Sequence, residues 1–168
     1  LAYGFGLHKD ENKTIAVYDL GGGTFDISIL QIQDGVFEVL STNGDTFLGG
    51  DDFDRAVVDF WLNELNLDRE FLAEEKEFAQ AIRLQAEAAK KALSNAEDFE
   101  TRILDKTLRL TRRDFDALVQ PLVQRTLDCC LLALRDAKLQ AAQIDKVVMV
   151  GGSTRVPLVK RAVSGFFG

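Results

Sequence analysis

The sequence predicts an α/β fold in which strands open the chain, helices fill its middle, and a strand and a helix close it. Apolar residues alternate with polar ones in the opening segments, which is the period of a strand packed on one face. The dipeptide Asp34-Gly35 is a two-residue hairpin signal between two of these segments. The predicted strands are 13–20, 24–33 and 36–45. We therefore expect an antiparallel arrangement, with the glycines at 21–23 forming the first reversal.

The spacing of apolar residues changes to a helical period after Gly49-Gly50. Asp51 or Asp52 can cap a helix there, because a short carboxylate accepts from the free N–H groups of a first turn. The apolar residues expected on its inner face are Phe53, Val57, and Phe60 or Trp61.

A longer helix is predicted over about 73–93, a stretch rich in Ala, Glu and Lys. Its expected apolar stripe is Phe78, Ile82, Ala89 and Leu93. Alternation returns over 99–111 and predicts a hairpin that reverses near Asp105-Lys106.

A second long helix is predicted to follow Thr111, whose hydroxyl can cap it. Pro121 should bend or restart this helix, because proline lacks the N–H that a helix interior needs. The helix is expected to continue to about Lys138. A buried strand, a glycine turn and a helix with Pro157 in its first turn then close the chain.

The composition limits the classes of function that the chain can have. The chain of 168 residues is 46% hydrophobic, which is enough for a sizeable core in one domain. A formal net charge of −7 argues against nucleic acid as a partner. The only cysteines, Cys129 and Cys130, are adjacent and predict neither disulfides nor a metal site, and His8 lies in a polar segment. Since no apolar run approaches the ~20 residues of a membrane span, we expect no membrane partner and a cytoplasmic location.

Three glycines between two aspartates form the most informative segment, "DLGGGTFD". The glycines 21–23 expose consecutive backbone N–H groups, and Thr24 adds a hydroxyl, so that an anion can approach the backbone. Asp19 and Asp26 flank this turn, as carboxylates do when Mg²⁺ and its waters accompany a phosphate. The segment is neither a P-loop nor a dinucleotide-binding turn. A glycine-rich hairpin without a ligand is the alternative.

Two further glycine pairs lead into predicted helices. Gly49 and Gly50 precede a helix N-terminus, whose free N–H groups and dipole favour an anion. Gly151 and Gly152 follow a buried strand, and their flat backbone can lie against a planar base on which Arg155 can stack. A plain linker and a plain strand–helix turn are the alternatives.

The long predicted helix carries four polar residues on one face. Glu87, Lys90, Lys91 and Ser94 lie at i, i+3, i+4 and i+7, so they can line a site together. Charge pairing on a solvated helix surface is the alternative.

These motifs, in their order, resemble the nucleotide-binding domain of DnaK-type chaperones, the seventy-kilodalton heat-shock family. The matching segments are "VYDLGGGTFDISIL", "NGDTFLGGDDFD", "AAKKALS" and "VMVGGSTRVP". The resemblance covers essentially the whole chain and implies an actin-like ATPase fold of the ribonuclease H-like type. It implies one lobe with a base subdomain, residues 1–48 and 121–168, and an inserted α+β subdomain, residues 49–120.

The resemblance also implies roles for the motif residues toward ATP or ADP and Mg²⁺. The β- and γ-phosphates would contact Gly21, Gly22, Gly23 and Thr24. The Mg²⁺ water shell and the attacking water would be organised by Asp19 and Asp26. The phosphate side of the cleft would be lined by Gly49 and Gly50. The ribose and adenine would lie between two sets, Glu87, Lys90, Lys91 and Ser94 on one side and Gly151, Gly152, Ser153 and Arg155 on the other.

Two departures from the general family pattern are visible. Asp51 stands where most members have Glu, so that its carboxylate reaches one methylene less, and the resemblance assigns it no direct role. The hairpin between Ser94 and Thr111 is short, and this feature is similar to the HscA-type branch that serves iron–sulfur cluster assembly.

The resemblance implies partners as well. We expect the first ATPase lobe and the peptide-binding domain of a longer parent chain, a J-domain co-chaperone, and a nucleotide exchange factor at the inserted subdomain. Because phosphoryl transfer needs charges around the whole γ-phosphate, one lobe alone should bind nucleotide weakly and not hydrolyse it. Two alternatives remain, an actin-like cytoskeletal ATPase and a non-catalytic partner-binding module.

Overall fold

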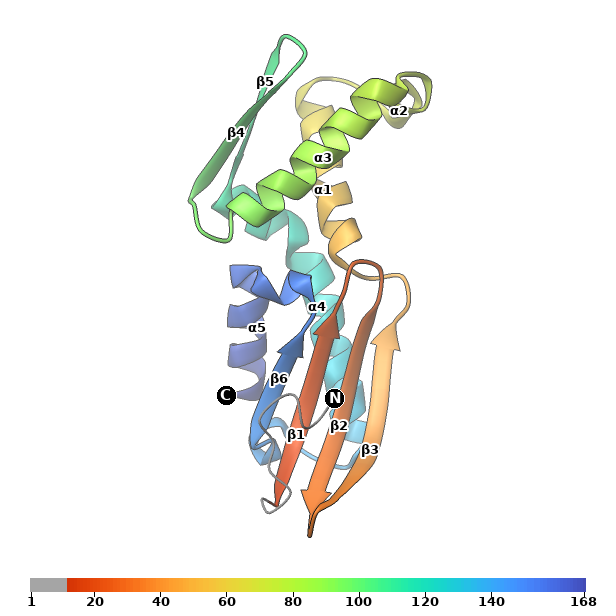
Figure 1. Ribbon diagram of the computed structural model, residues 1–168, viewed down its shortest axis with the longest axis vertical. Coiled ribbons are helices and arrows are strands. Elements are labelled where there is room, and N and C mark those ends of the chain that lie inside the picture. Colours follow the sequence, from red (N-terminus) through yellow and green to blue (C-terminus); the bar gives the residue numbers. More distant parts are fainter. Residues whose placement is uncertain (1–11) are drawn as a thin grey trace.

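A four-stranded sheet forms one end of the elongated molecule in the computed structural model, which describes residues 12–168 (Figure 1). The order in the sheet is β3-β2-β1-β6; the first three strands are antiparallel, and β6 is parallel to β1. The strands are β1 (Lys13–Leu20), β2 (Phe25–Gln33), β3 (Val36–Asp45) and β6 (Lys146–Val150). The predicted opening strands are confirmed to within one residue. Asp34 and Gly35 form the hairpin turn, with φ of 50° and 78°.

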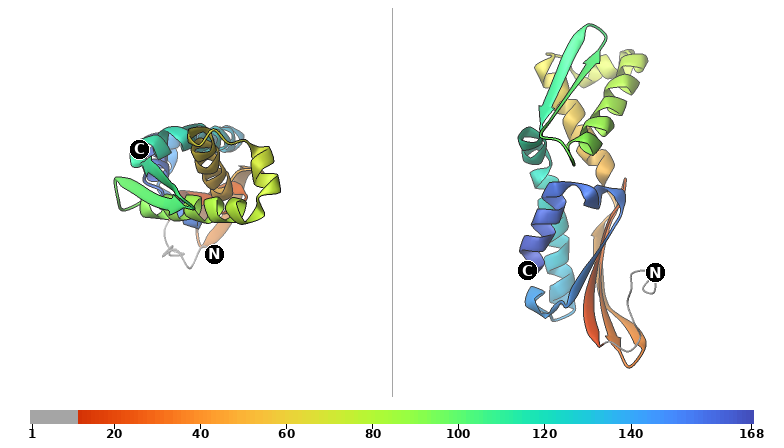
Figure 2. Two further views of the ribbon diagram at one scale, coloured as in Figure 1. Left: turned by 90° about the horizontal axis from the view of Figure 1, so that it is seen from above. Right: turned by 60° about the vertical axis from the view of Figure 1, so that its left-hand side comes forward.

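Two helices, α4 (Arg112–Asp136) and α5 (Pro157–Phe167), cover one face of this sheet (Figure 2). Every second side chain of β1 and β2 points into the core between sheet and helices, as the alternation in the sequence predicted. The buried side chains of these two strands on this face are Ala16, Tyr18, Leu20, Phe25, Ile27 and Ile29.

The helix α4 is continuous through Pro121, so the predicted restart is wrong, while the predicted bend stays a prediction. Pro121 and Ala117, whose carbonyl loses its helical partner, are both exposed, so water can replace the missing bond. Val119 and Val123, which flank the proline, are fully buried and anchor this part of the helix in the core. The predicted cap is confirmed, since Thr111 Oγ1 accepts from the N–H of Asp114 at 3.0 Å.

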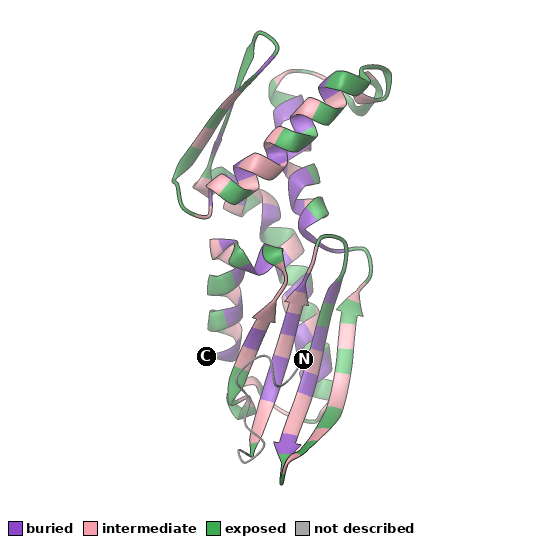
Figure 3. Cartoon of the chain, viewed as in Figure 1, coloured by how far each residue is buried: buried purple, intermediate pink, exposed green. Residues whose placement is uncertain are grey.

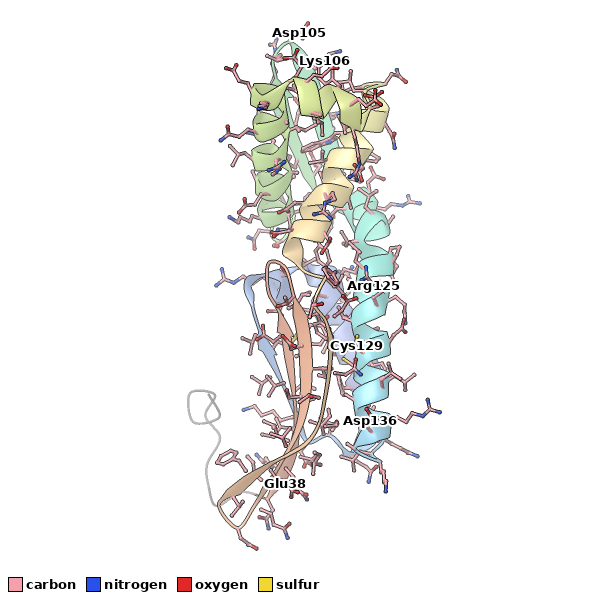
Figure 4. All side chains as sticks on the ribbon, turned by 90° about the vertical axis from the view of Figure 1, so that its right-hand side faces the viewer. Glu38, Asp105, Lys106, Arg125, Cys129 and Asp136 are labelled. Atoms are coloured by element: carbon pink, nitrogen blue, oxygen red, sulfur yellow. The ribbon has the colours of Figure 1, made fainter. Side chains whose placement is uncertain are left out.

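By length and composition, α4 is the one helix among residues 12–168 that could cross a membrane. A helix buried in a protein core meets the same criterion. The helix runs along β3, where Ser41 Oγ donates to the carbonyl of Ala133 at 2.6 Å and Arg125 pairs with Asp45 (Figure 4). These contacts join α4 to the edge of the sheet.

The other end of the molecule contains three helices and a hairpin. The elements are α1 (Gly50–Glu64), α2 (Arg69–Glu74), α3 (Lys76–Ala92), β4 (Asp98–Ile103) and β5 (Lys106–Thr111). The helix predicted over 73–93 is therefore broken at Glu75, whose ψ of 77° is not helical. The break lets Phe71 pack edge-to-face against Phe78, with ring centroids 5.4 Å apart. The hairpin turns at Leu104 and Asp105, close to the predicted reversal.

This end has its own buried layer, visible as the buried inner sides of α1 and α3 in Figure 3. Trp61 is fully buried; its Nε1 donates to the carbonyl of Arg109 at 2.9 Å and its ring stacks on Phe99. The predicted stripe of α3 is confirmed, and Ala86 belongs to it too. The hairpin, with Asp105 and Lys106 labelled at its tip, therefore packs on α1 through its inner face (Figure 4).

Backbone hydrogen bonds attach α1 to the turn between β1 and β2. The N–H groups of Gly50 and Asp51 donate to the carbonyls of Gly21 and Gly22, both at 2.8 Å. A Cβ on Gly49 would lie 2.3 Å from the oxygen of Gly22, so only glycine fits there. Gly49 is the N-cap, which corrects the prediction of Asp51 or Asp52.

The contact at Gly49 yields the first prediction. Gly49→Ala should lower the free energy of unfolding by about 2 kcal/mol, because its Cβ forces the helix away from the glycine turn. Urea denaturation measures the loss. Gly152→Ala is the matched control, since nothing lies within 4 Å of a Cβ there; equal losses in the two variants would contradict this account of Gly49.

A buried hydroxyl pair between sheet and α4 yields the second prediction. Thr126 Oγ1 donates to the carbonyl of Val123 at 2.6 Å, so Tyr18 is the donor in its own 2.6 Å bond to Thr126 Oγ1. Burial raises the pKa of Tyr18, and a phenolic donor left without a partner is costly. Thr126→Val should therefore destabilise the fold by about 2 kcal/mol, and Tyr18→Phe by about 1 kcal/mol. Urea denaturation would refute the assignment if Tyr18→Phe proved the more damaging change.

Candidate functional site

A cleft of about 770 Å³ lies where α1, α3 and the β6–α5 connection meet. It brings together residues from four segments that the sequence singled out separately. The predicted site residues that line it are Gly22, Gly50, Glu87, Lys90, Lys91, Ser94, Gly152, Ser153 and Arg155. Residues that line it without having been predicted as site residues are Asp51, Asp54, Asn95, Val156 and Lys160.

The polar face of α3 forms one wall, and its two lysines behave differently. Lys91 is exposed and donates to Glu87 Oε1 at 2.7 Å. This hydrogen bond lowers the pKa of Glu87 and raises the pKa of Lys91. Lys90 turns inward instead: its Nζ lies 2.9 Å from Asp54 Oδ1 and donates to the carbonyl of Gly50 at 3.2 Å.

Asp54 is the functional candidate that sequence reasoning missed. Its side chain is 11% exposed, and burial raises its pKa although the Lys90 ammonium acts in the opposite direction. A signal existed in the sequence, because Asp54 lies three and four residues before Val57 and Val58 and therefore on the buried side of α1. A carboxylate among apolar residues of a helix requires a partner.

The β6–α5 connection forms the opposite wall. It is a short 3-10 turn, Gly152–Arg155, that is held by Thr154 Oγ1 donating to the carbonyl of Gly151 at 2.6 Å. Ser153 is buried, and its Oγ lies 3.5 Å from the carbonyl of Gly21. Arg155 is exposed and forms no ion pair with any residue of 12–168, so its guanidinium can turn to a ligand.

The glycines of the three loops fall into two groups. Gly49 and Gly151 are required by the chain itself, because an added Cβ would collide with backbone atoms, whereas at Gly50 it would meet the side chains of Ser153 and Lys90. At Gly151, φ is +96° and a Cβ would lie 2.2 Å from the oxygen of Leu20. Added Cβ atoms at Gly23 and Gly152 would meet nothing within 4 Å. Space for a bound group therefore exists beside Gly23 and Gly152, whereas Gly49 and Gly151 serve packing.

The predicted use of the α1 N-terminus as a source of free N–H groups is wrong. The N–H groups of Gly50 and Asp51 are occupied by the glycine turn, and that of Asp52 bonds the carbonyl of Gly49. The N–H of Gly49 donates to Asp52 Oδ2 at 2.8 Å. An anion near this helix end would meet its dipole but none of these donors.

The two flanking aspartates lie outside the cleft lining but next to each other. Asp19 on β1 pairs with Asp26 on β2 in the antiparallel register, so both side chains are on the same face of the sheet. That face is the one opposite α4, since the neighbouring Leu20 and Phe25 point into the core. Asp19 is half-buried and Asp26 is exposed. Two carboxylates side by side on one face of the sheet could hold a hydrated Mg²⁺ through water.

The remaining predicted residues lie in the glycine turn itself. Gly21 donates its N–H to the carbonyl of Thr24 at 3.1 Å, which closes the turn. Gly23 and Thr24 are exposed at its tip. The turn is therefore the link between the cleft, which it enters at Gly22, and the Asp19–Asp26 pair at its base.

Comparison with known families agrees with this arrangement. A family model described as Hsp70 protein matches residues 1–168. The four-stranded sheet with its covering helices and the helix–hairpin part fit a lobe of the actin-like ATPase fold, as the sequence predicted. Members of this family generally bind ATP or ADP with Mg²⁺ and work with J-domain proteins and nucleotide exchange factors. With the match spanning its whole length, the chain belongs to the Hsp70 family.

Proposed function

We propose that this chain is the adenine-nucleotide-binding lobe of an ATP-dependent Hsp70 chaperone. The observation that carries the proposal is the cleft itself, in which the glycine turn, the polar face of α3 and the β6–α5 connection converge. These segments are separated by tens of residues along the chain, and no packing requirement accounts for glycine at Gly23 or Gly152. A bound ligand explains both the convergence and the open space.

The residues of each wall suggest which part of the nucleotide that wall would contact. The ribose and adenine would lie between α3 and the β6–α5 connection, where Glu87, Ser94 and Arg155 offer hydrogen bonds and a stacking surface. The phosphates would extend toward the backbone of Gly22 and Gly23. Mg²⁺, when bound, would neutralise phosphate charge and orient water. Asp19 and Asp26 would hold its water shell and the attacking water, and the Thr24 hydroxyl would contact the phosphates.

We propose the same two-part division that the sequence indicated. Residues 1–48 and 121–168 would form the base and residues 49–120 an inserted subdomain that responds to an exchange factor. The insertion joins the base at the Gly49–Gly50 junction and through the continuous helix α4. A rotation of the insertion would therefore strain both the Gly50–Gly21 hydrogen bond and the Pro121 region of α4, where one helical bond is missing.

The cellular role follows from the family. Nucleotide binding and hydrolysis in the complete protein would drive client binding and release together with a J-domain co-chaperone. The hairpin β4–β5 has only six residues in each strand, and this short length supports our proposal of the HscA-type branch of iron–sulfur cluster assembly. A cytoplasmic location is proposed with it. The lobe alone surrounds only part of a γ-phosphate, so it should bind nucleotide weakly and not hydrolyse it.

Calorimetric titration with Mg²⁺-ADP provides the third prediction. The chain should bind it, and Gly23→Val should weaken binding by about tenfold or more, because the added side chain occupies the space proposed for phosphate. Arg155→Ala should weaken binding by about tenfold through loss of base stacking. Neither variant should lower the midpoint of urea denaturation, since both positions are open or exposed.

Gly165→Val is the matched control for Gly23→Val. Gly165 lies on α5 outside the cleft, and a Cβ there also meets nothing within 4 Å. This control should bind Mg²⁺-ADP as the unmodified chain does. Absence of binding in the unmodified chain would refute the nucleotide proposal and favour a module that only binds protein partners.

A further inference from the structure

A buried ion pair joins α1 to α3 in the wall of the cleft. Lys90 Nζ lies 2.9 Å from Asp54 Oδ1, and the two side chains are 13% and 11% exposed. The same ammonium donates to the carbonyl of Gly50 at 3.2 Å. Both Lys90 and Asp54 line the cleft, so this pair belongs to the surface that faces a ligand.

A contribution to the free energy of folding is a poor explanation for this ion pair. Burying two charges costs more free energy than their attraction returns in many proteins. Here burial raises the pKa of Asp54 above its ordinary value despite Lys90. A carboxyl group whose folded-state pKa is raised binds its proton more tightly in the folded state, so its contribution to the free energy of unfolding falls as the pH rises through that pKa. The charged form of Asp54 is thus maintained at a cost.

The geometry gives Lys90 a fixed position that the neighbouring lysine lacks. Lys91 is 71% exposed and pairs with Glu87, which is 45% exposed, and such surface pairs restrain a side chain weakly. Lys90 is held by two oxygen atoms that belong to α1, one from Asp54 and one from Gly50. An ammonium has three donors, so a donor remains for a ligand in the cleft.

We propose that Asp54 is a positioning residue of the cleft, which holds Lys90 against the Gly50 carbonyl so that its remaining donor faces the nucleoside part of the ligand. The inference rests on the proposed nucleotide site and deepens it, because it assigns a role to a residue that does not itself contact the ligand. Loss of the carboxylate charge should release Lys90 from the wall.

Two measurements test the proposal, and the first needs no nucleotide. Amine acylation followed by mass spectrometry should modify Lys91 faster than Lys90 in the unmodified chain. In Asp54→Asn, modification of Lys90 should accelerate toward the rate of Lys91, which serves as the internal reference. Asp59→Asn is the matched control: Asp59 also lies on α1, but its exposed ion pair is with Arg69 of α2, and loss of this pair should leave Lys90 protected.

The second measurement is an NMR titration with adenosine, an uncharged probe whose binding is insensitive to the net charge of the cleft. Asp54→Asn and Lys90→Met should each weaken adenosine binding by about tenfold, the loss expected for one hydrogen bond from a charged group. In the Lys90→Met background, Asp54→Asn should cause no further loss, because Asp54 acts only through Lys90.

The outcomes separate this inference from the proposed function. Unchanged acylation of Lys90 in Asp54→Asn would overturn the inference, as would a full second loss of affinity in the Lys90→Met background. Protection of Lys90 that is lost in Asp54→Asn, together with non-additive losses of affinity, would support it. If neither adenosine nor Mg²⁺-ADP binds the unmodified chain, the nucleotide proposal fails, and the role of Asp54 in nucleoside binding is overturned with it even where acylation shows that Asp54 fixes Lys90.

Discussion

The cleft depends on two backbone hydrogen bonds between the glycine turn and the start of α1. The carbonyls of Gly21 and Gly22 accept from the N–H groups of Gly50 and Asp51, both at 2.8 Å. These bonds satisfy donors that a helix N-terminus otherwise leaves free, and they set the distance between the sheet and the helical end. Because peptide groups alone form them, their geometry tolerates little adjustment. The open backbone beside Gly23 and the wall formed by α3 are placed relative to each other by this contact.

The helix α4 provides the second connection between the two ends of the molecule. It starts beside the hairpin, where Phe115 packs edge-to-face against Phe53 of α1, and it ends against the sheet. Its continuity through Pro121 means that the two ends share one rigid element. An Hsp70 lobe built in this way can transmit a displacement of its helical end to the sheet without a folded linker. A rotation of the helical end relative to the sheet would therefore have to bend or twist α4 itself.

Local patterns predicted most of the fold, since alternation gave the strands and helical spacing gave the buried faces. The errors lie where tertiary contacts override local preference. Gly49 rather than an aspartate caps α1 because the glycine turn already occupies the first N–H groups. The break at Glu75 reflects the packing of Phe71 on Phe78. The sequence also predicted which segments line the cleft, but it did not identify Asp54, whose importance depends on an ion pair formed across 36 positions of the chain, from 54 to 90.

The dual role of Gly50 has a consequence for how this lobe tolerates change. Its N–H reaches the glycine turn and its carbonyl reaches Lys90, so one residue without a side chain connects the glycine turn to α3. A Cβ there would lie 2.3 Å from Ser153 Oγ and 3.1 Å from Lys90 Nζ. Substitution by alanine removes atoms at most positions, but at Gly50 it adds a methyl group. An alanine there would require both Ser153 Oγ and Lys90 Nζ to move, so a change at this one position would act on both walls of the cleft together.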